Sequence, residues 1–346
     1  MNWLVFGAGA IGTYIGGSLV LSNLPDGGAH RVVFVDRPEV AAEIRQHGLL
    51  LTLEGVDHFI PSPHVAGSIG EALDSGPFDV ALFALKSYDT VAALENLSPV
   101  IPRLPPLLCL QNGVENEPTL EAALGPGKVI AGSVTSAVSK LGLGQIVLER
   151  RRGVGVASGH PLSLAIVSAF SRSGLNAHLF PRASDMKWSK MLTNLLANAT
   201  SAILDMPPEE IFAHPGLYQL EVAQLREALR VMSASGIQVV DLPGTPVRLL
   251  ALGVRLPVRF SRPMLHRAVG RGRGAKMPSF HIDLHNRIGK SEVGYLNGAV
   301  VRAGERLGIP TPVNSLLTNT LLSLVHGDIP LAEYAHQPDK LIKGLS

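Results

Sequence analysis

The sequence predicts an α/β protein in two parts: an N-terminal, Rossmann-type doubly wound domain over 1–181 and a mainly α-helical C-terminal domain over 182–346. Three observations predict this architecture. A glycine-rich turn follows the first apolar strand, apolar strands alternate with helices through the first half, and beyond Pro181 the apolar residues recur with helical spacing. The length of 346 residues suits two domains, and a hydrophobic fraction of 46% lets both bury a core.

Composition and charge exclude several classes of protein. The 30 Lys and Arg residues nearly balance the 28 Asp and Glu residues, so we expect no nucleic-acid partner. Cys109 is the only cysteine, which excludes an intramolecular disulfide and fits a cytoplasmic protein. Residues 1–25 are uncharged, and Gly12 and Gly16 form the GxxxG spacing of membrane helix pairs. Because glycines interrupt this run and no basic segment precedes it, we expect neither a signal peptide nor a membrane span.

The first motif with a chemical meaning is GAGAIG, formed by Gly7, Ala8, Gly9, Ala10, Ile11 and Gly12. We expect a strand over Trp3–Phe6 before it and a helix over Thr13–Leu21 after it, which is the setting that dinucleotide binding requires. Gly7 allows the tight turn, Gly9 lets the backbone approach a pyrophosphate, and Gly12 lets the helix pack closely on the strand. The helix N-terminus then presents free N–H groups to the phosphates.

The second strand, Arg31–Val35, ends in two charged residues of opposite sign, Asp36 and Arg37. An acid at this place suits the ribose 2′-hydroxyl of NAD, whereas an arginine nearby suits the 2′-phosphate of NADP. A solvated strand end is the alternative for both residues. These residues alone therefore leave the choice of cofactor open.

Two further buried strands are followed by polar residues. Asp79–Leu85 ends at Lys86, and Leu107–Leu110 lies shortly before Asn112 and Gly113. Because ligands bind beyond the carboxyl ends of the strands in open α/β sheets, we expect Lys86 and Asn112 to border the crevice beside the glycine loop. The alternatives are simple exposure for Lys86 and an ordinary turn for Asn112-Gly113.

Strand-like segments continue to Pro181, and helices follow it. We expect the remaining strands of the first half over 129–136, 145–148, 154–157 and 176–180. A helix over Asp185–Ala202 then carries Lys190, Asn194 and Asn198 at positions i, i+4 and i+8, on one side. A lysine and two asparagines on an otherwise apolar helix indicate either a ligand or a solvated polar stripe.

The rest of the second half is predicted to be helical around a basic connector. We expect helices over Leu217–Ser235 and over Ser291–Leu307, the second with Glu292 near its start. Seven Lys and Arg residues and no acid lie between Arg255 and Lys276, which we interpret as a solvated connector rather than an anion-binding patch.

One short motif has the spacing of a metal site. His281, Asp283 and His285 form HxDxH, but no further ligand is clustered near them in the sequence, so we expect no metal.

Together these motifs resemble the ketopantoate reductase family, the 2-dehydropantoate 2-reductases, over nearly the whole chain. The resemblance rests on GAGAIG at 7–12, Lys86, LQNG at 110–113, WSKMLTN at 188–194, Pro278-Ser279, EVGYLNG at 292–298 and GIPTPVN at 308–314. It implies a Rossmann domain and a helical domain with the active site in the cleft between them. It also implies NADPH-dependent reduction of 2-dehydropantoate to pantoate, as in pantothenate biosynthesis, by a cytoplasmic enzyme, with a homodimer as one option for its assembly.

The resemblance assigns a role to each matched residue. Lys190 corresponds to the general acid, and Glu292 to the residue that binds the substrate hydroxyl. Asn112 is implied to orient the nicotinamide ribose and the substrate, and Lys86 to lie near the cofactor. Asn194 and Asn198 are implied to bind substrate polar groups, and Ser279 the substrate carboxylate. Arg37 matches the position that faces the 2′-phosphate, so we predict a preference for NADPH, with NAD as the other option.

Several departures from the family pattern bear on the substrate and cofactor. Gly294 stands where the family often has an acid, and the region 240–276 is longer and more basic than in compact members. Asp36 before Arg37 is unusual for the family, so we expect the preference for NADPH over NADH to be smaller than in members that lack this acid. Two alternatives remain: a related reductase of another 2-oxo acid, and a dinucleotide sensor without catalysis.

Overall fold

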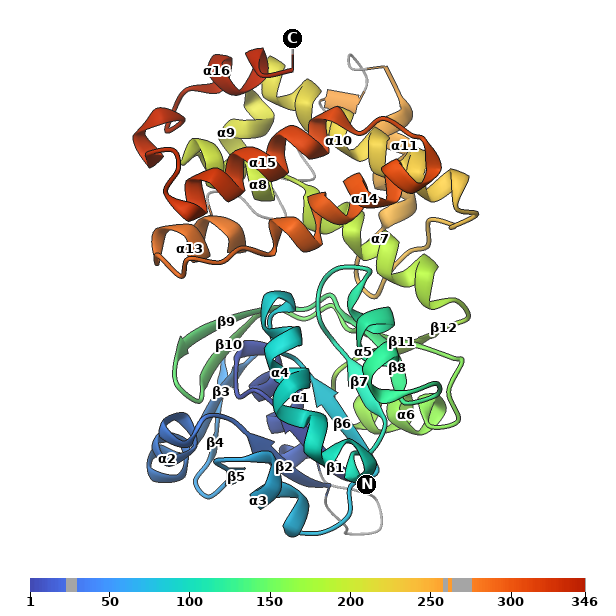
Figure 1. Cartoon of the computed structure of the whole chain (residues 1–346). Coiled ribbons are helices and arrows are strands. Elements are labelled where there is room, and N and C mark those ends of the chain that lie inside the picture. The colour runs from blue at the N-terminus through green and yellow to red at the C-terminus, as the bar shows by residue number, and fades with distance from the viewer. Residues whose placement is uncertain (23–29, 258–260, 263–275, 346) are drawn as a thin grey trace. The chain divides into compact units, whose positions relative to one another are not determined.

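The computed structural model describes residues 1–22, 30–257, 261–262 and 276–345, and its chain divides into two compact units (Figure 1). The first unit comprises Met1–Lys187 and Leu242–Thr245, and the second comprises Trp188–Asp241 and Pro246–Ser346. This division falls inside a helix, between Lys187 and Trp188. Most of the basic segment 255–276 singled out in the sequence lies outside the described residues.

The first unit is built on an eight-stranded sheet. Its order is β12 (Ala177–Phe180), β11 (Val154–Ala157), β8 (Val129–Val134), β7 (Leu107–Cys109), β6 (Val80–Phe83), β1 (Asn2–Phe6), β2 (Arg31–Val35) and β5 (His64–Ala66). Strands β8 and β11 are antiparallel, and the other neighbouring pairs are parallel. From β5 to β8 this is the order of a doubly wound nucleotide-binding sheet, which confirms the predicted fold class.

Apolar residues cover both faces of this sheet. Along β1, Trp3 and Val5 belong to one buried cluster, whereas Leu4 and Phe6 belong to the other. Side chains alternate between the faces of a strand, so both faces are covered, as near-continuous apolar strands require. The helices of this unit are α1 (Ala10–Leu21), α2 (Pro38–His47), α3 (Ile69–Asp74), α4 (Thr90–Leu97), α5 (Asn116–Leu124) and α6 (Ser163–Arg172), with 3-10 turns η1 (Ser87–Asp89) and η2 (Ser98–Arg103).

A second, four-stranded sheet in this unit was only partly predicted. Its order is β4 (Val56–Ile60), β3 (Leu49–Leu53), β10 (Gln145–Arg150) and β9 (Ala137–Gly142). The sequence analysis identified β10 and missed its three partners, as it also missed β5. Strand β4 is largely exposed and carries Asp57 and His58, so it lacks the apolar pattern by which a strand is recognised.

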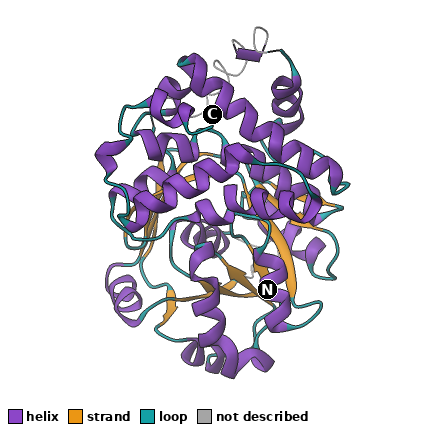
Figure 2. Cartoon of the chain, turned by 45° about the horizontal axis from the view of Figure 1, so that its top comes forward, coloured by secondary structure: helices purple, strands orange, loops and turns teal. Residues whose placement is uncertain are grey.

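The second unit is helical (Figure 2). Helix α7 (Ala183–Leu195) runs through the division between the units. The other elements are α8 (Asn198–Leu204), α9 (Pro208–Ala213), α10 (Pro215–Ala234), α11 (Val247–Arg255), α13 (Ser279–His285), η3 (Glu292–Tyr295), α14 (Asn297–Leu307), α15 (Pro312–His326), η4 (Leu331–Glu333) and α16 (Pro338–Lys343). Among the described residues, no helix is both long enough and apolar enough to cross a bilayer.

The predicted continuous helix over 185–202 is wrong, because it breaks between α7 and α8. Ala197 has a left-handed backbone with φ of 48°. The break is stabilised from α10: the Glu221 carboxylate accepts the Ala197 N–H at 2.8 Å and the Thr200 hydroxyl at 2.6 Å, and Gln224 donates to the Leu195 carbonyl at 3.3 Å. Backbone groups that leave a helix must find partners when they are buried, and these side chains supply them.

The predicted helix over 291–307 is wrong at its start. Glu292 belongs to the 3-10 turn η3, and α14 begins only at Asn297, after a break at Leu296. Asn297 is fully buried, and its side chain donates to Gln224 Oε1 and to Asn314 Oδ1, both at 3.0 Å. The local sequence does not reveal the partners in these buried hydrogen bonds, and it therefore does not predict where the helix starts.

Candidate active site

The glycine loop has the geometry that the sequence predicts. Gly7 has φ of 86°, and a Cβ there would lie 2.9 Å from Leu85 Cδ2. A Cβ on Gly12 would lie 1.9 Å from the Gly7 carbonyl oxygen, whereas one on Gly9 would meet nothing within 4 Å. Gly7 and Gly12 are thus required by the fold itself. Gly9 leaves open space in front of the N-terminus of α1, as a pyrophosphate needs.

The Asp36 carboxylate lies against this loop. One oxygen accepts the Ala8 N–H at 2.8 Å, and the other accepts the Arg37 N–H, also at 2.8 Å. Arg37 precedes α2 and is exposed. These hydrogen bonds direct Asp36 toward the loop. That Arg37 faces the cofactor ribose stays a prediction.

Lys86 and Asn112 lie at the same edge of the sheet as the glycine loop. Strands β1, β6 and β7 are parallel neighbours, with Phe6 beside Phe83 and Phe83 beside Cys109. The segments that follow β6 and β7 are joined by two hydrogen bonds, from the Ser87 hydroxyl to the Asn112 carbonyl at 2.9 Å and from the Gln111 amide to the Lys86 carbonyl at 3.2 Å. The structure thus brings these residues together, and their contacts with the cofactor stay a prediction.

Lys187 is a buried cation that the sequence analysis missed. Its ammonium group lies 2.6 Å from Glu117 Oε1 and donates to the Gln111 carbonyl at 2.7 Å and the Gly132 carbonyl at 3.3 Å. Burial by itself lowers the pKa of Lys187, but Glu117 and Cys109 outweigh burial and hold that pKa above its ordinary value. One feature of the sequence could have identified Lys187 as a buried cation: it stands between Met186 and Trp188 on a buried helix face.

Lys187 therefore fixes the turn that carries Asn112. The Gln111 carbonyl immediately precedes Asn112 in the chain, and it accepts its hydrogen bond from a charged donor. Hydrogen bonds to charged groups are about twice as strong as neutral ones. We assign Lys187 a positioning role for this turn rather than a direct contact with a ligand.

The residues predicted to handle the substrate lie in the second unit. Lys190 and Asn194 are one turn apart on α7 and half-buried, whereas Met191 and Leu192 between them are buried. The break after α7 separates Asn198 from this stripe, so the predicted alignment of all three residues on one helix is wrong. Asn198 begins α8, where its Oδ1 accepts the Phe280 N–H at 3.2 Å.

Ser279 and Glu292 occupy different surroundings. Ser279 is the exposed first residue of α13, directly before the Phe280 whose N–H binds Asn198. Asn198 and Ser279 are therefore brought together by one hydrogen bond. Glu292 is buried, with an exposed fraction of 3%.

Buried polar residues of α10 support the segments that carry the predicted substrate-binding residues, and they were not predicted from the sequence. Glu221, Gln224 and Glu227 recur on one face of the helix and are buried. Glu227 accepts the backbone N–H groups of Val313 and Asn314, each at 2.9 Å. The spacing of three residues between Glu221, Gln224 and Glu227 on an otherwise amphipathic helix could have identified them in the sequence.

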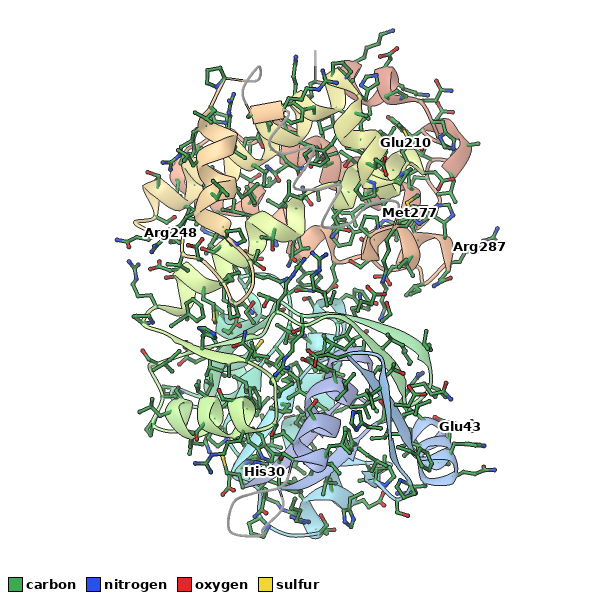
Figure 3. All side chains as sticks on the ribbon, turned by 180° about the vertical axis from the view of Figure 1, so that it is seen from behind. His30, Glu43, Glu210, Arg248, Met277 and Arg287 are labelled. Carbon is green, nitrogen blue, oxygen red and sulfur yellow. The ribbon has the colours of Figure 1, made fainter. Side chains whose placement is uncertain are left out.

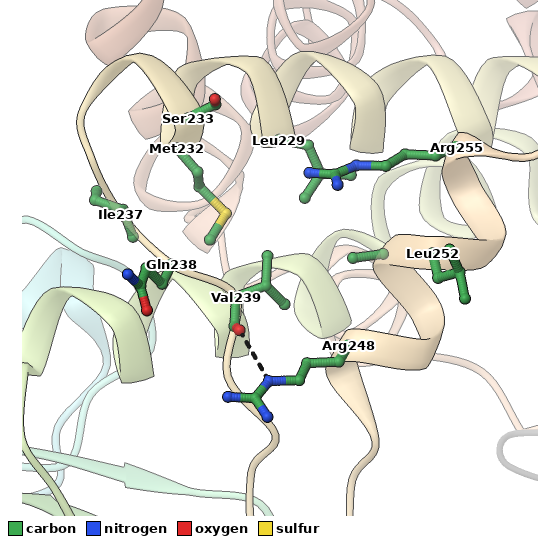
Figure 4. Close-up of a pocket in the computed structure, with 10 residues that line it drawn as sticks. Leu229, Met232, Ser233, Ile237, Gln238, Val239, Arg248, Leu252 and Arg255 are labelled. Carbon is green, nitrogen blue, oxygen red and sulfur yellow. Dashed lines mark hydrogen bonds between the residues drawn. The ribbon is translucent and has the colours of Figure 1, made fainter.

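A pocket elsewhere in the second unit is separate from the predicted site. It lies between α10 and α11, where Arg248 donates to the Val239 carbonyl at 3.3 Å (Figure 4). Its described lining residues include none of the predicted site residues.

Comparison with known proteins identifies the family. The model described as ketopantoate reductase PanE/ApbA matches residues 3–158, and the model of the C-terminal part of the same family matches residues 182–324. The chain is 25% identical to 2-dehydropantoate 2-reductase of Pyrococcus horikoshii over 322 residues, covering 92% of this chain and 95% of the relative. The corresponding enzyme of Archaeoglobus fulgidus is 25% identical over 327 residues, covering 93% and 96%.

Solved structures share the fold over nearly the full length. A PanE/ApbA family ketopantoate reductase from Ralstonia eutropha has a TM-score of 0.77 at 26% identity, covering 95% of this chain and 99% of that one. D-mandelate dehydrogenase, solved with NADH and anilino(oxo)acetate, has a TM-score of 0.76 at 22% identity, covering 94% and 99%. Since the two family models together match most of the sequence, the chain belongs to the ketopantoate reductase family.

Proposed function

We propose that this chain catalyses the NADPH-dependent reduction of 2-dehydropantoate to pantoate in the cytoplasm. The observation that carries the proposal is the pair Lys190 and Asn194, which are half-buried one turn apart on a helix where Met191 and Leu192 between them are buried. Relatives named 2-dehydropantoate 2-reductase, matched over more than nine tenths of the chain, support the substrate.

The chemistry divides between the two units. When bound, the reduced nicotinamide supplies a hydride to the C2 carbonyl of the 2-oxo acid. The residues around the glycine loop would hold the dinucleotide: Gly9 would allow the pyrophosphate to approach the backbone, and Lys86 and Asn112 would bind near the nicotinamide ribose. These are the residues whose positions in the first unit fit such a ligand.

The second unit supplies the proton and binds the substrate. The C2 oxygen acquires negative charge as the carbonyl is reduced, and it needs both a proton and a positive neighbour. Lys190 provides both from its ammonium group. Asn194, Asn198 and Ser279 bind the polar groups and the carboxylate of the substrate, and Glu292 accepts a hydrogen bond from its hydroxyl.

The cofactor preference depends on Asp36 and Arg37. The Arg37 guanidinium is exposed and suits a 2′-phosphate, which supports NADPH. The Asp36 carboxylate, hydrogen-bonded to the Ala8 N–H, repels that phosphate and suits a ribose 2′-hydroxyl, which supports NADH as the second candidate. We propose that the two effects nearly offset each other, so that NADPH is preferred by about tenfold or less, roughly 1.4 kcal/mol.

The test is oxidation of NADPH and of NADH by the purified protein with 2-dehydropantoate and a panel of other 2-oxo acids. The proposal expects the highest kcat/KM with 2-dehydropantoate. A higher value with another 2-oxo acid would identify a related reductase, and binding of the dinucleotide without turnover on any acid would identify a sensor.

Variants at the end of β2 test the cofactor preference separately. Arg37→Ala is expected to raise the KM for NADPH and to leave that for NADH nearly unchanged, whereas Asp36→Ala is expected to favour NADPH. Equal losses with both cofactors in Arg37→Ala would show that Arg37 supports the fold, and the NADPH assignment would then be withdrawn.

A further inference from the structure

Three side chains that no step of the reductase mechanism uses converge in the second unit. Asp205 ends α8, and His281 and His285 are one turn apart on α13, which lies between Met277 and Arg287 as labelled in Figure 3. His281 Nε2 lies 2.6 Å from Asp205 Oδ1, and His285 Nε2 lies 3.7 Å from the same oxygen. One potential ligand atom from each residue lies within 4.8 Å of the other two.

The acid in this group differs from the one that the local sequence offers. HxDxH suggested Asp283, but residues two apart on a helix point in different directions, and Asp283 is buried. The fold instead brings Asp205 to the two histidines. No local pattern connects Asp205 with α13, because the contact between Asp205 and His281 spans 76 residues.

The Asp205 carboxylate has one more histidine beside it than a single hydrogen bond requires. A single histidine satisfies the Asp205 carboxylate, yet a second imidazole directs its Nε2 toward the same oxygen. The two rings stack with centroids 4.0 Å apart and an angle of 24° between their planes, so both Nε2 edges face one point. Two stacked imidazoles and a carboxylate that face a common point form the donor set of a cation site.

The distances lie close to those of a four-coordinate site. With zinc–ligand bonds of about 2.0–2.2 Å, tetrahedral ligand atoms are about 3.3 Å apart. The two observed separations from Asp205 Oδ1, 2.6 Å and 3.7 Å, fall on either side of this value.

We propose that Asp205, His281 and His285 bind a divalent first-row transition-metal ion, with Zn²⁺ as the ion whose preferred ligands match theirs. Imidazole nitrogen selects against Mg²⁺ and Ca²⁺, which prefer oxygen. Three protein ligands leave a fourth position for water. The ion would connect the C-terminal ends of α8 and α13. The N-terminal ends of these two helices are already connected by the hydrogen bond between Asn198 and Phe280.

The test is titration of the metal-free full chain with Zn²⁺, followed by calorimetry. We expect one equivalent to bind, and His285→Ala and Asp205→Asn each to weaken binding at least tenfold, the lower end of the losses seen around metal sites. His326→Ala is the matched control, because His326 is an exposed helical histidine of the same unit that takes no part in the cluster. That variant is expected to bind zinc like the parent.

A second measurement guards against an effect of folding. His285 is exposed, so its alanine variant is expected to keep the unfolding temperature of the metal-free parent while losing the rise that zinc produces in the parent. Zinc affinity that is unchanged in both His285→Ala and Asp205→Asn, or that falls equally in His326→Ala, would overturn the proposal. So would the absence of one-to-one binding to the parent.

Discussion

In the first unit the predicted functional residues follow the ends of strands, whereas in the second unit two of them, Asn198 and Glu292, lie beside breaks between helical segments. The glycine loop, Lys86 and Asn112 share one sheet edge because β1, β6 and β7 are parallel neighbours. Asn198 and Glu292 instead belong to short segments next to Ala197 and Leu296, where helices stop. The first arrangement follows from backbone topology, and the second depends on buried side chains of another helix.

The difference affects how each half responds to mutation. A strand end is held by a ladder of backbone hydrogen bonds, so few single side chains determine its position. A helix break exposes polar backbone groups, and Glu221 and Gln224 supply their partners from α10. We therefore expect distant side chains to control the second half of the site and local backbone geometry to control the first.

The largest expected effect is on chemistry in the second unit. Lys190→Ala removes the proposed proton donor and is expected to lower kcat by about 10²–10⁴-fold, the range for general acid catalysis. Binding of NADPH, measured by fluorescence titration, is expected to stay normal, because the cofactor residues belong to the first unit. Lys343→Ala serves as the control for loss of a lysine, and near-normal turnover in Lys190→Ala would exclude the mechanism.

Lys187 is the exception in the first unit, since a buried side chain there fixes a turn. Lys187→Met leaves the Glu117 carboxylate without its partner and is expected to lower the free energy of unfolding by about 3–5 kcal/mol. Adding Glu117→Leu to this variant is expected to restore most of the loss, because an apolar pair of similar size is tolerated. Denaturant unfolding of the two single variants and the double variant measures this coupling, and purely additive losses would contradict it.

The same pair predicts a pH dependence. Since the folded state holds the pKa of Lys187 above its unfolded value, the stabilisation is complete below about pH 10 and is lost as the pH rises through the raised pKa. We expect Lys187→Met with Glu117→Leu to remove this alkaline loss from a plot of unfolding free energy against pH. If the unfolding free energy of the double variant falls at alkaline pH as it does in the parent, other groups cause that fall.

Glu221 tests the contrast directly. Glu221→Ala deprives the Ala197 N–H and the Thr200 hydroxyl of their acceptor and is expected to lower the free energy of unfolding by about 1–3 kcal/mol. We also expect a higher KM for the 2-oxo acid, because Asn198 directly follows the break, with an unchanged Kd for NADPH. A variant that weakens NADPH binding and substrate binding equally would show that the two halves are not controlled separately.

The glycine loop offers a matched pair with the smallest expected effects. Gly12→Ala places a methyl group against the Gly7 carbonyl and is expected to destabilise the protein by about 1–3 kcal/mol, as overpacking does. Gly9→Ala meets open space, so the unfolding temperature is expected to stay constant while Kd for NADPH rises about tenfold, roughly 1.4 kcal/mol. Equal destabilisation by both variants would remove the distinction between a glycine needed by the fold and one needed by the ligand.

The sequence alone was sufficient for features set by neighbouring residues. The glycine loop, the strands β1, β2, β6, β7 and β8 and the residues at their ends follow from local apolar runs and turns. It was insufficient where residues far apart in the chain decide the outcome. Glu221 breaks a helix that its own apolar pattern predicts to be continuous, and β3, β4 and β9 are strands because of the sheet they join. Asp205 was likewise missed as a partner of His281, because only the fold brings them together.

Cys109 has a practical consequence for attaching probes to the two units. It is the chain's only cysteine, it is fully buried in β7, and burial, with Glu117, raises the pKa of its thiol. Because the thiolate is the reactive form, thiol-directed dyes and spin labels will spare it. A cysteine introduced at exposed Ala122 in the first unit and another at exposed Ala234 in the second will therefore be labelled selectively in the otherwise natural sequence. Each unit can then carry its own probe, with no need to build a cysteine-free background.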